Sequence, residues 1–122
     1  MQYAILCYHS EDVVCSWSKE ADDAVMAKLA VVQEKLARQG KLGPVVRLMP
    51  TTAATTLRKH TEPGVVIDGP FAETKEQLLG FYVVNCDSLD EVLDIARDLG
   101  RANPGGAYEI RPIALLRPGS TG

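Results

Sequence analysis

The feature that most constrains the fold is a pair of short segments that are apolar at nearly every position. Residues 2–8 carry apolar side chains on both alternating sets of positions, and residues 81–86 follow almost the same pattern. A strand with two apolar faces is normally covered on both of them. We therefore expect both segments to form strands of a sheet whose two faces are packed.

Two other segments have the apolar spacing of amphipathic helices. Residues 19–39 are predicted to form the first helix. The second begins at Ser88, which forms a capping box with Glu91, and Gly100 is its predicted C-cap. The first stripe that we expect to face the core consists of Val25, Leu29, Val32 and Leu36. The second consists of Leu89, Val92, Leu93, Ala96 and Leu99.

Shorter elements fill the rest of the chain. The sequence predicts a strand over 45–49, a hairpin formed by 53–59 and 65–68, one or two helical turns over 73–79, and a last strand over 107–116. This order predicts an α+β fold, a ferredoxin-like split βαβ sandwich with an inserted β-hairpin. Two helices cover only one face of such a sheet. We therefore expect the second apolar face to pack against another copy of the chain in a homodimer.

Length and composition set the class of protein. The 122 residues predict one domain over 1–117 and a flexible tail over 118–122. No apolar run is long enough to cross a bilayer, and the first residues lack a basic segment and a cleavage site. We therefore expect a cytoplasmic protein with no membrane partner. The net charge of -3 and the lack of a basic block argue against direct nucleic-acid binding.

Three cysteines, Cys7, Cys15 and Cys86, are odd in number and have no CxxC spacing. This pattern favours reduced thiols, with Cys7 and Cys86 filling the core. Only His9 and His60 are available to join them as metal ligands, so no metal site is expected. The sequence shows no nucleotide-binding fingerprint either, and we expect no cofactor.

Residues 68–80 contain the densest group of side chains that could take part in catalysis or binding. Asp68, Glu73 and Glu76 are three carboxylates in a loop between two apolar strands, and they are the candidate catalytic residues. If two of them converge, one pKa rises and the pair can transfer protons. Lys75 is able to neutralise them instead. The competing interpretation is structural, with Asp68 capping a turn and the other charges forming a solvated face.

The same segment resembles a known signature. Residues 68–78, Asp-Gly-Pro-Phe-Ala-Glu-Thr-Lys-Glu-Gln-Leu, are similar to the motif of DGPF-domain proteins, a branch of the YCII-related superfamily. The stretches 54–58, 89–92 and 109–112 also match, so that the resemblance covers nearly the whole chain. It implies a dimeric α+β barrel, in agreement with the order of elements.

The resemblance implies less about the function than about the fold. In the superfamily a His on the first helix and an Asp have been proposed as an acid/base dyad, but this chain has no His between Ser10 and Lys59. We therefore expect either small-molecule binding or a cofactor-free, isomerase- or lyase-like site that uses Asp68. The candidate ligand-binding residues are His9, Arg58, Phe71, Lys75 and Arg111.

Two alternatives remain open. Members of the family are often encoded beside extracytoplasmic-function sigma factors, so that the chain is alternatively a regulatory module that contacts such a factor. The third alternative makes the DGPF loop a folding element, in which Asp68 caps, Gly69 and Pro70 turn the chain, and Phe71 fills the core.

Overall fold

A computed structural model of the chain describes residues 1–119. Within these residues, no helix combines the length and the apolar character needed to cross a membrane. The elements in chain order are β1 (Gln2–His9), α1 (Glu11–Val14), α2 (Lys19–Arg38), β2 (Leu42–Arg47), the 3₁₀ helix η1 (Thr51–Ala53), β3 (Thr55–Arg58), β4 (Val65–Asp68), β5 (Gln77–Asn85), α3 (Leu89–Ala102) and β6 (Ala107–Pro112).

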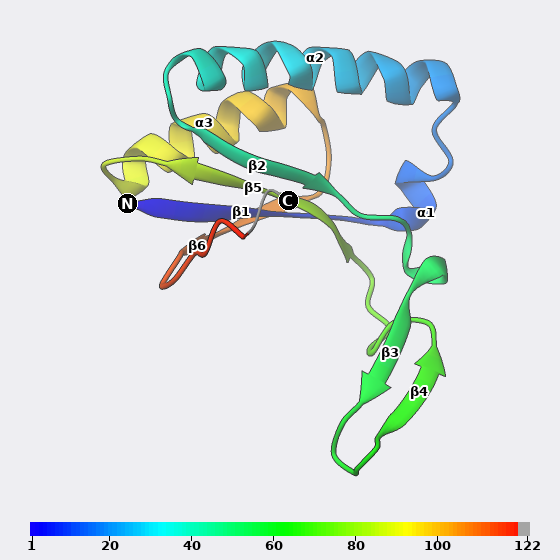
Figure 1. Cartoon of the computed structure of the whole chain (residues 1–122). Helices are drawn as coiled ribbons and strands as arrows, with labels where there is room; N and C mark the ends of the chain where they lie inside the picture. Colours follow the sequence, from blue (N-terminus) through cyan, green and yellow to red (C-terminus); the bar gives the residue numbers. More distant parts are fainter. Residues whose placement is uncertain (120–122) are drawn as a thin grey trace.

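Four antiparallel strands form the main sheet in the order β2-β5-β1-β6. The two segments that were predicted as strands with two apolar faces form β1 and β5, and they lie at its centre. Helices α2 and α3 both cover the same face of this sheet (Figure 1). The structure is therefore a mixed α+β fold, and the opposite sheet face has no helix over it.

The core lies between the two helices and the sheet. Ile5 of β1 sits opposite Tyr82 of β5 and Ile110 of β6, and all three side chains belong to this core or pack against it. In α2, Leu29 and Leu36 are buried, while Val25 and Val32 pack beside them. The predicted stripe of the first helix is confirmed.

Helix α3 confirms its predicted start and corrects its predicted end. The Ser88 side chain accepts a hydrogen bond from the Glu91 N–H at 3.2 Å, and the Glu91 carboxylate accepts one from the Asp87 N–H at 3.0 Å. The helix continues past Gly100 to Ala102, so the predicted C-cap was wrong. The last turn buries Ala102 in the core, and this burial holds the glycine inside the helix.

The buried face of α3 also differs from the prediction at two residues. Leu89, in the first turn, is 53% exposed, and Leu93 is only partly buried. The residues of α3 that are buried are Val92, Ile95, Ala96, Leu99 and Ala102.

Strand β5 begins at Gln77, which overturns the prediction of helical turns over 73–79. Gln77 pairs with His9 of β1, and Gly80 pairs with Arg47 of β2, so that tertiary pairing decides the local structure. A Cβ at position 80 would collide with the Val46 carbonyl oxygen, and only glycine lets the two strands approach this closely.

Three other strands differ in length from the prediction. Strand β3 covers Thr55–Arg58 rather than 53–59, since Thr51–Ala53 form η1. Strand β2 starts at Leu42 rather than at 45, through Gly43 and Pro44, with an irregularity in the ladder before Val45. Strand β6 ends at Pro112, four residues before the predicted end. Residues 118 and 119 of the predicted tail have no regular secondary structure, and 120–122 lie outside the described residues.

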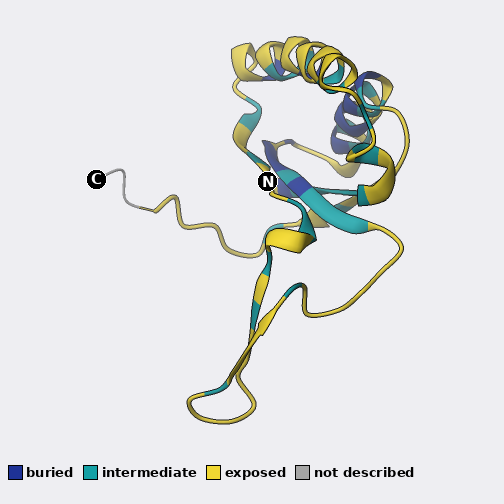
Figure 2. Ribbon diagram, turned by 90° about the vertical axis from the view of Figure 1, so that its right-hand side faces the viewer, coloured by how far each residue is buried: buried dark blue, intermediate teal, exposed yellow. Residues whose placement is uncertain are grey.

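Residues 55–71, which we call the arm, comprise the hairpin of β3 and β4 and the turn that follows it. The arm projects away from the main sheet and is exposed along most of its length (Figures 1 and 2). The Gly69 N–H donates to the Ala54 carbonyl at 2.7 Å, and the Thr56 hydroxyl donates to the Gly69 carbonyl at 2.8 Å. Phe71 is 72% exposed. It does not fill the core, because the turn at Gly69 and Pro70 keeps it on the arm, so that part of the folding-element alternative was wrong.

Candidate functional site

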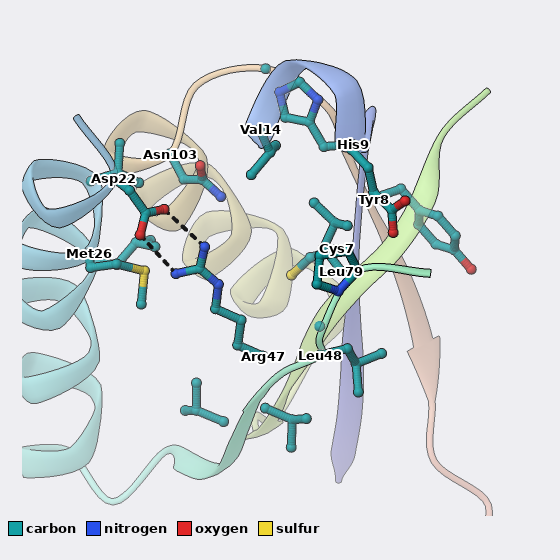
Figure 3. Close-up of a pocket in the computed structure, with 18 of the residues that line it drawn as sticks. Cys7, Tyr8, His9, Val14, Asp22, Met26, Arg47, Leu48, Leu79 and Asn103 are labelled. Carbon is teal, nitrogen blue, oxygen red and sulfur yellow. Dashed lines mark hydrogen bonds and ion pairs between the residues drawn. The ribbon is translucent and has the colours of Figure 1, made fainter. Parts of the chain in front are cut away.

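A cavity of about 460 Å³ lies between α2 and the helix-covered face of the sheet. It opens beside α1, where β1 ends and β2 leaves the sheet (Figure 3). Most of its wall is hydrocarbon, since the strands and the helix both present apolar side chains there. The apolar wall includes Val14, Val25, Met26, Leu29, Val45 and Leu79.

His9 lies at one end of the cavity, as the last residue of β1. The Ser10 N–H donates to His9 Nδ1 at 2.7 Å. This acceptor role leaves the ring proton of the neutral imidazole on Nε2, which makes Nε2 a hydrogen-bond donor. The ring of Trp17 meets the His9 ring edge-on, with centroids 6.2 Å apart.

Gly105 is the other neighbour of the His9 ring. Its φ of +87° suits glycine, and a Cβ at this position would stand 2.6 Å from His9 Nε2. The loop after α3 therefore approaches the imidazole by its backbone alone, and position 105 has no room for a side chain while the ring stays where it is.

A charged pair spans the cavity wall from α2 to β2. Arg47 donates to both carboxylate oxygens of Asp22, at 2.9 and 3.2 Å (Figure 3). The hydrogen bond to Asp22 raises the pKa of Arg47 above its ordinary value. This bidentate geometry is the strongest that a guanidinium and a carboxylate can form, and it fixes the helix to the edge of the sheet.

Glu11 is the remaining carboxylate of the wall among the described residues. One of its oxygens accepts from the Thr51 N–H and the other from the Thr51 hydroxyl, both at 2.7 Å. Its own N–H donates to the Gln77 side-chain oxygen at 2.9 Å. Glu11 thus ties α1 to η1 and to the start of β5.

The wall also includes thiols, tyrosine hydroxyls and side-chain amides. Burial raises the pKa of Cys7 to about 12 and that of Tyr108 to about 12. Asn103 donates to the Tyr108 hydroxyl at 3.4 Å, and Gln33 donates to the Tyr82 hydroxyl at 3.4 Å. Among residues 1–119, no group of three or more His, Cys, Asp or Glu side chains is arranged to hold a metal ion. The cavity can therefore enclose a small molecule and offer it hydrogen bonds.

The three candidate catalytic carboxylates lie elsewhere. Asp68 ends β4, and Glu73 and Glu76 follow in the DGPF loop; all three are exposed and none lines the cavity. No described residue donates a hydrogen bond to the Asp68 carboxylate, so that the predicted turn-capping bond is not formed. A catalytic role for these residues stays a prediction.

One of the five candidate ligand-binding residues lines the cavity, and the other four lie elsewhere on the chain. His9 lines the cavity, whereas Arg58, Phe71, Lys75 and Arg111 do not. Arg58 donates to the Phe71 carbonyl at 3.2 Å and lies over its ring, 5.8 Å from the centroid. Arg111 stands 3.9 Å from Glu109, a partner expected for a strand arginine, on an exposed part of β6.

Sequence reasoning missed Asp22, Gln33, Arg47 and Tyr82 as cavity residues. The signal that could have found Arg47 is its place in Val45-Val46-Arg47-Leu48, where a single cation interrupts an apolar strand. Its partner Asp22 has no such signal, because it is one of several acidic residues near the start of α2.

Comparisons with known proteins address the whole chain. The model of the YCII-related domain matches residues 1–117. An uncharacterized protein of Rhizobium meliloti is 62% identical over 120 residues, which cover 98% of this chain and 97% of that protein. The motif in the arm and the strands that build the cavity thus fall within one family domain. The chain belongs to the YCII-related family.

Proposed function

We propose that the chain binds a small molecule in the cavity under α2, and that His9 donates a hydrogen bond or a proton to it. The observation that carries this proposal is the His9 imidazole, whose Nδ1 accepts from the Ser10 N–H, at the end of a largely apolar cavity of about 460 Å³. That volume lies in the range of ligand pockets. A donor of this kind polarises a carbonyl oxygen, which is the first requirement of a cofactor-free isomerase or lyase.

Binding can be measured with the protein's own fluorescence, because Trp17 is the single tryptophan and lines the cavity. Prodan, an uncharged naphthalene ketone, is a suitable probe, since its emission shifts when its carbonyl accepts a hydrogen bond. We expect energy transfer from Trp17 to bound prodan. Val45→Phe, which fills the cavity, should weaken binding roughly tenfold. Val66→Phe on the arm is the matched control and should leave it unchanged.

The role of His9 requires a second variant. His9→Phe keeps a ring but removes the Nε2–H, so prodan emission should move to shorter wavelength and binding should weaken by about 1 kcal/mol. His60→Phe, on the exposed arm, should change neither quantity. Prodan that bound with no energy transfer from Trp17, or equally well to Val45→Phe, would contradict the cavity as the site.

The DGPF-loop carboxylates are tested with the same probe. If the cavity alone is the site, Asp68→Asn and Glu76→Gln should bind prodan as the wild type does. A loss of binding in either variant would bring the loop into the site and favour the original assignment of Asp68 as the acid/base group.

A second candidate function is supported by the arm. Leu57 is 56% exposed and Val66 is 68% exposed on a hairpin that projects from the rest of the chain (Figure 2). A two-stranded hairpin is only marginally stable when nothing packs against it. We propose that the arm and the helix-free face of the sheet contact a second copy, in a ferredoxin-like, dimeric α+β barrel. A sigma factor is the alternative occupant.

Light scattering distinguishes these partners. We expect a dimer at micromolar concentration, and Leu57→Glu should shift it toward the monomer. A wild-type chain that is monomeric throughout this range would contradict the homodimer. Titration of a purified extracytoplasmic-function sigma factor from the same organism into that monomer would then decide whether the arm binds the alternative partner.

A further inference from the structure

We propose that the ligand of the cavity is an uncharged, mainly apolar molecule, and that the Arg47–Asp22 pair sets this specificity. The inference rests on the proposed function, in which the cavity binds a small molecule. In the described residues, the guanidinium of Arg47 and the carboxylates of Asp22 and Glu11 all make hydrogen bonds within the protein.

The guanidinium of Arg47 is already paired with a carboxylate. Arg47 is the one permanently cationic side chain of the described wall, and two of its nitrogens are held by the two oxygens of Asp22. An anionic ligand would have to displace Asp22 or approach a guanidinium whose charge is already balanced. Entering a largely apolar cavity strips water from an anion, and no unpaired cation offsets that cost.

The carboxylate of Glu11 is the second group. Both of its oxygens already accept hydrogen bonds from Thr51, which carry no charge. They hold α1 against η1, so that a cationic ligand would have to compete there with hydrogen bonds that the protein already makes. With one guanidinium and two carboxylates on the wall, an anion faces an unfavourable balance as well.

The remaining polar groups are dipoles rather than charges. His9 offers Nε2–H, Cys7 stays a thiol, and Gln33 and Tyr82 face each other across the wall. These groups suit a ligand with one or two neutral oxygen acceptors, such as a ketone, lactone or phenol, on a ring-sized apolar body.

Two probes of almost the same shape test this inference. N-phenylnaphthylamine is uncharged, and anilinonaphthalene sulfonate carries the same rings with one sulfonate. Energy transfer from Trp17 reports each probe at the cavity. In the wild-type chain we expect the uncharged probe to bind roughly tenfold more tightly or better than the sulfonate.

The variant Asp22→Asn should narrow or abolish this preference. It frees the Arg47 guanidinium while keeping the shape of the wall, so the affinity for the sulfonate should rise roughly tenfold and that for the uncharged probe should stay. Asp23→Asn is the matched control. It removes the same charge from the next residue of α2, where Asp23 pairs with Lys19 at 2.6 Å and lies outside the cavity wall. It should change neither affinity.

The outcomes separate the two proposals. If neither probe shows energy transfer in any variant, cavity binding itself fails. If the wild type binds both probes equally, or if Asp22→Asn leaves the preference unchanged, the cavity binds ligands but the charge argument is overturned. A cationic ring probe, trimethylnaphthylammonium, that bound more tightly than the uncharged probe would overturn it as well.

Discussion

The cavity and the arm are two regions of one small domain with opposite character. The cavity is enclosed by α2, α1 and the sheet, and its charged side chains Asp22, Arg47 and Glu11 are hydrogen-bonded within the protein. The arm is a two-stranded hairpin with large apolar side chains in solvent. The sequence motif that identifies the family lies in and after the arm, whereas the cavity is built from residues that form no motif.

This difference teaches that a recognisable motif and an enclosed site need not coincide. Residues 68–71 are conspicuous because they contain turn-formers and a charge between strands. The cavity residues come from distant elements, with Cys7, Asp22, Arg47 and Asn103 on four different parts of the chain. Their proximity depends on the sheet order and on the placement of α2. The predictions below test how separate the two regions are.

The largest expected effect contrasts core with arm. Leu99 is fully buried, so Leu99→Ala should lower the free energy of unfolding by about 2–5 kcal/mol. Leu57→Ala removes the same atoms from a side chain that is 56% exposed on the arm, and should cost roughly 1 kcal/mol or less. Urea denaturation measures both. A comparable cost at Leu57 would mean that the arm is buried against a partner.

Thiol reactivity gives a second contrast. Cys15 is exposed, Cys86 is buried, and burial raises the pKa of Cys7 to about 12. With a disulfide reagent at neutral pH, we expect Cys15 to react about a hundredfold faster than the other two. In a Val66→Cys variant the new thiol should match Cys15. Protection of this added thiol at high protein concentration would show that the arm is covered, and would break the contrast.

A smaller effect concerns the hydrogen bond that caps the first turn of α3. Ser88→Ala removes the side-chain cap of α3 and should cost about 1 kcal/mol of stability. The control is Ser10→Ala, because Ser10 stands at the N-cap of α1 but its side chain makes no capping bond. Thermal unfolding followed by circular dichroism compares them, and equal losses would contradict the assignment of the cap.

The smallest effect is a pH dependence. The hydrogen bond from Lys41 holds the pKa of Glu91 below its ordinary value, with the two groups 2.6 Å apart. A lowered folded-state pKa adds stability that is present above the unfolded pKa and is lost as the pH falls through the folded one. Glu91→Gln should therefore lose less stability than the wild type on acidification below about pH 4.3. Glu73→Gln, in the exposed loop, should follow the wild type.

Much of the fold was predictable because local patterns and tertiary structure agree. The two-sided apolar strands became the centre of the sheet, and the capping box of Ser88 began α3. The errors arose where contacts between distant parts of the chain decide where an element begins or ends. The start of β5 depends on its neighbours on both sides, and the end of α3 depends on the burial of Ala102.

The candidate site was less predictable for a physical reason. Of the residues proposed from sequence, His9 reaches the cavity, because a residue at the end of a central strand is carried to the edge of the core. Arg47 and Asp22 are 25 positions apart, and only the packing of α2 over β2 joins them. No spacing rule within a single segment encodes such a pair.

The outer strands of the main sheet, β2 and β6, each contain a proline, Pro44 and Pro112. A proline lacks the backbone N–H that an added strand would need, so each outer strand resists extension by a strand from another molecule. Aggregation through the sheet borders is thereby disfavoured. The dimer proposed above would therefore use the helix-free face of the sheet and the arm rather than the sheet borders.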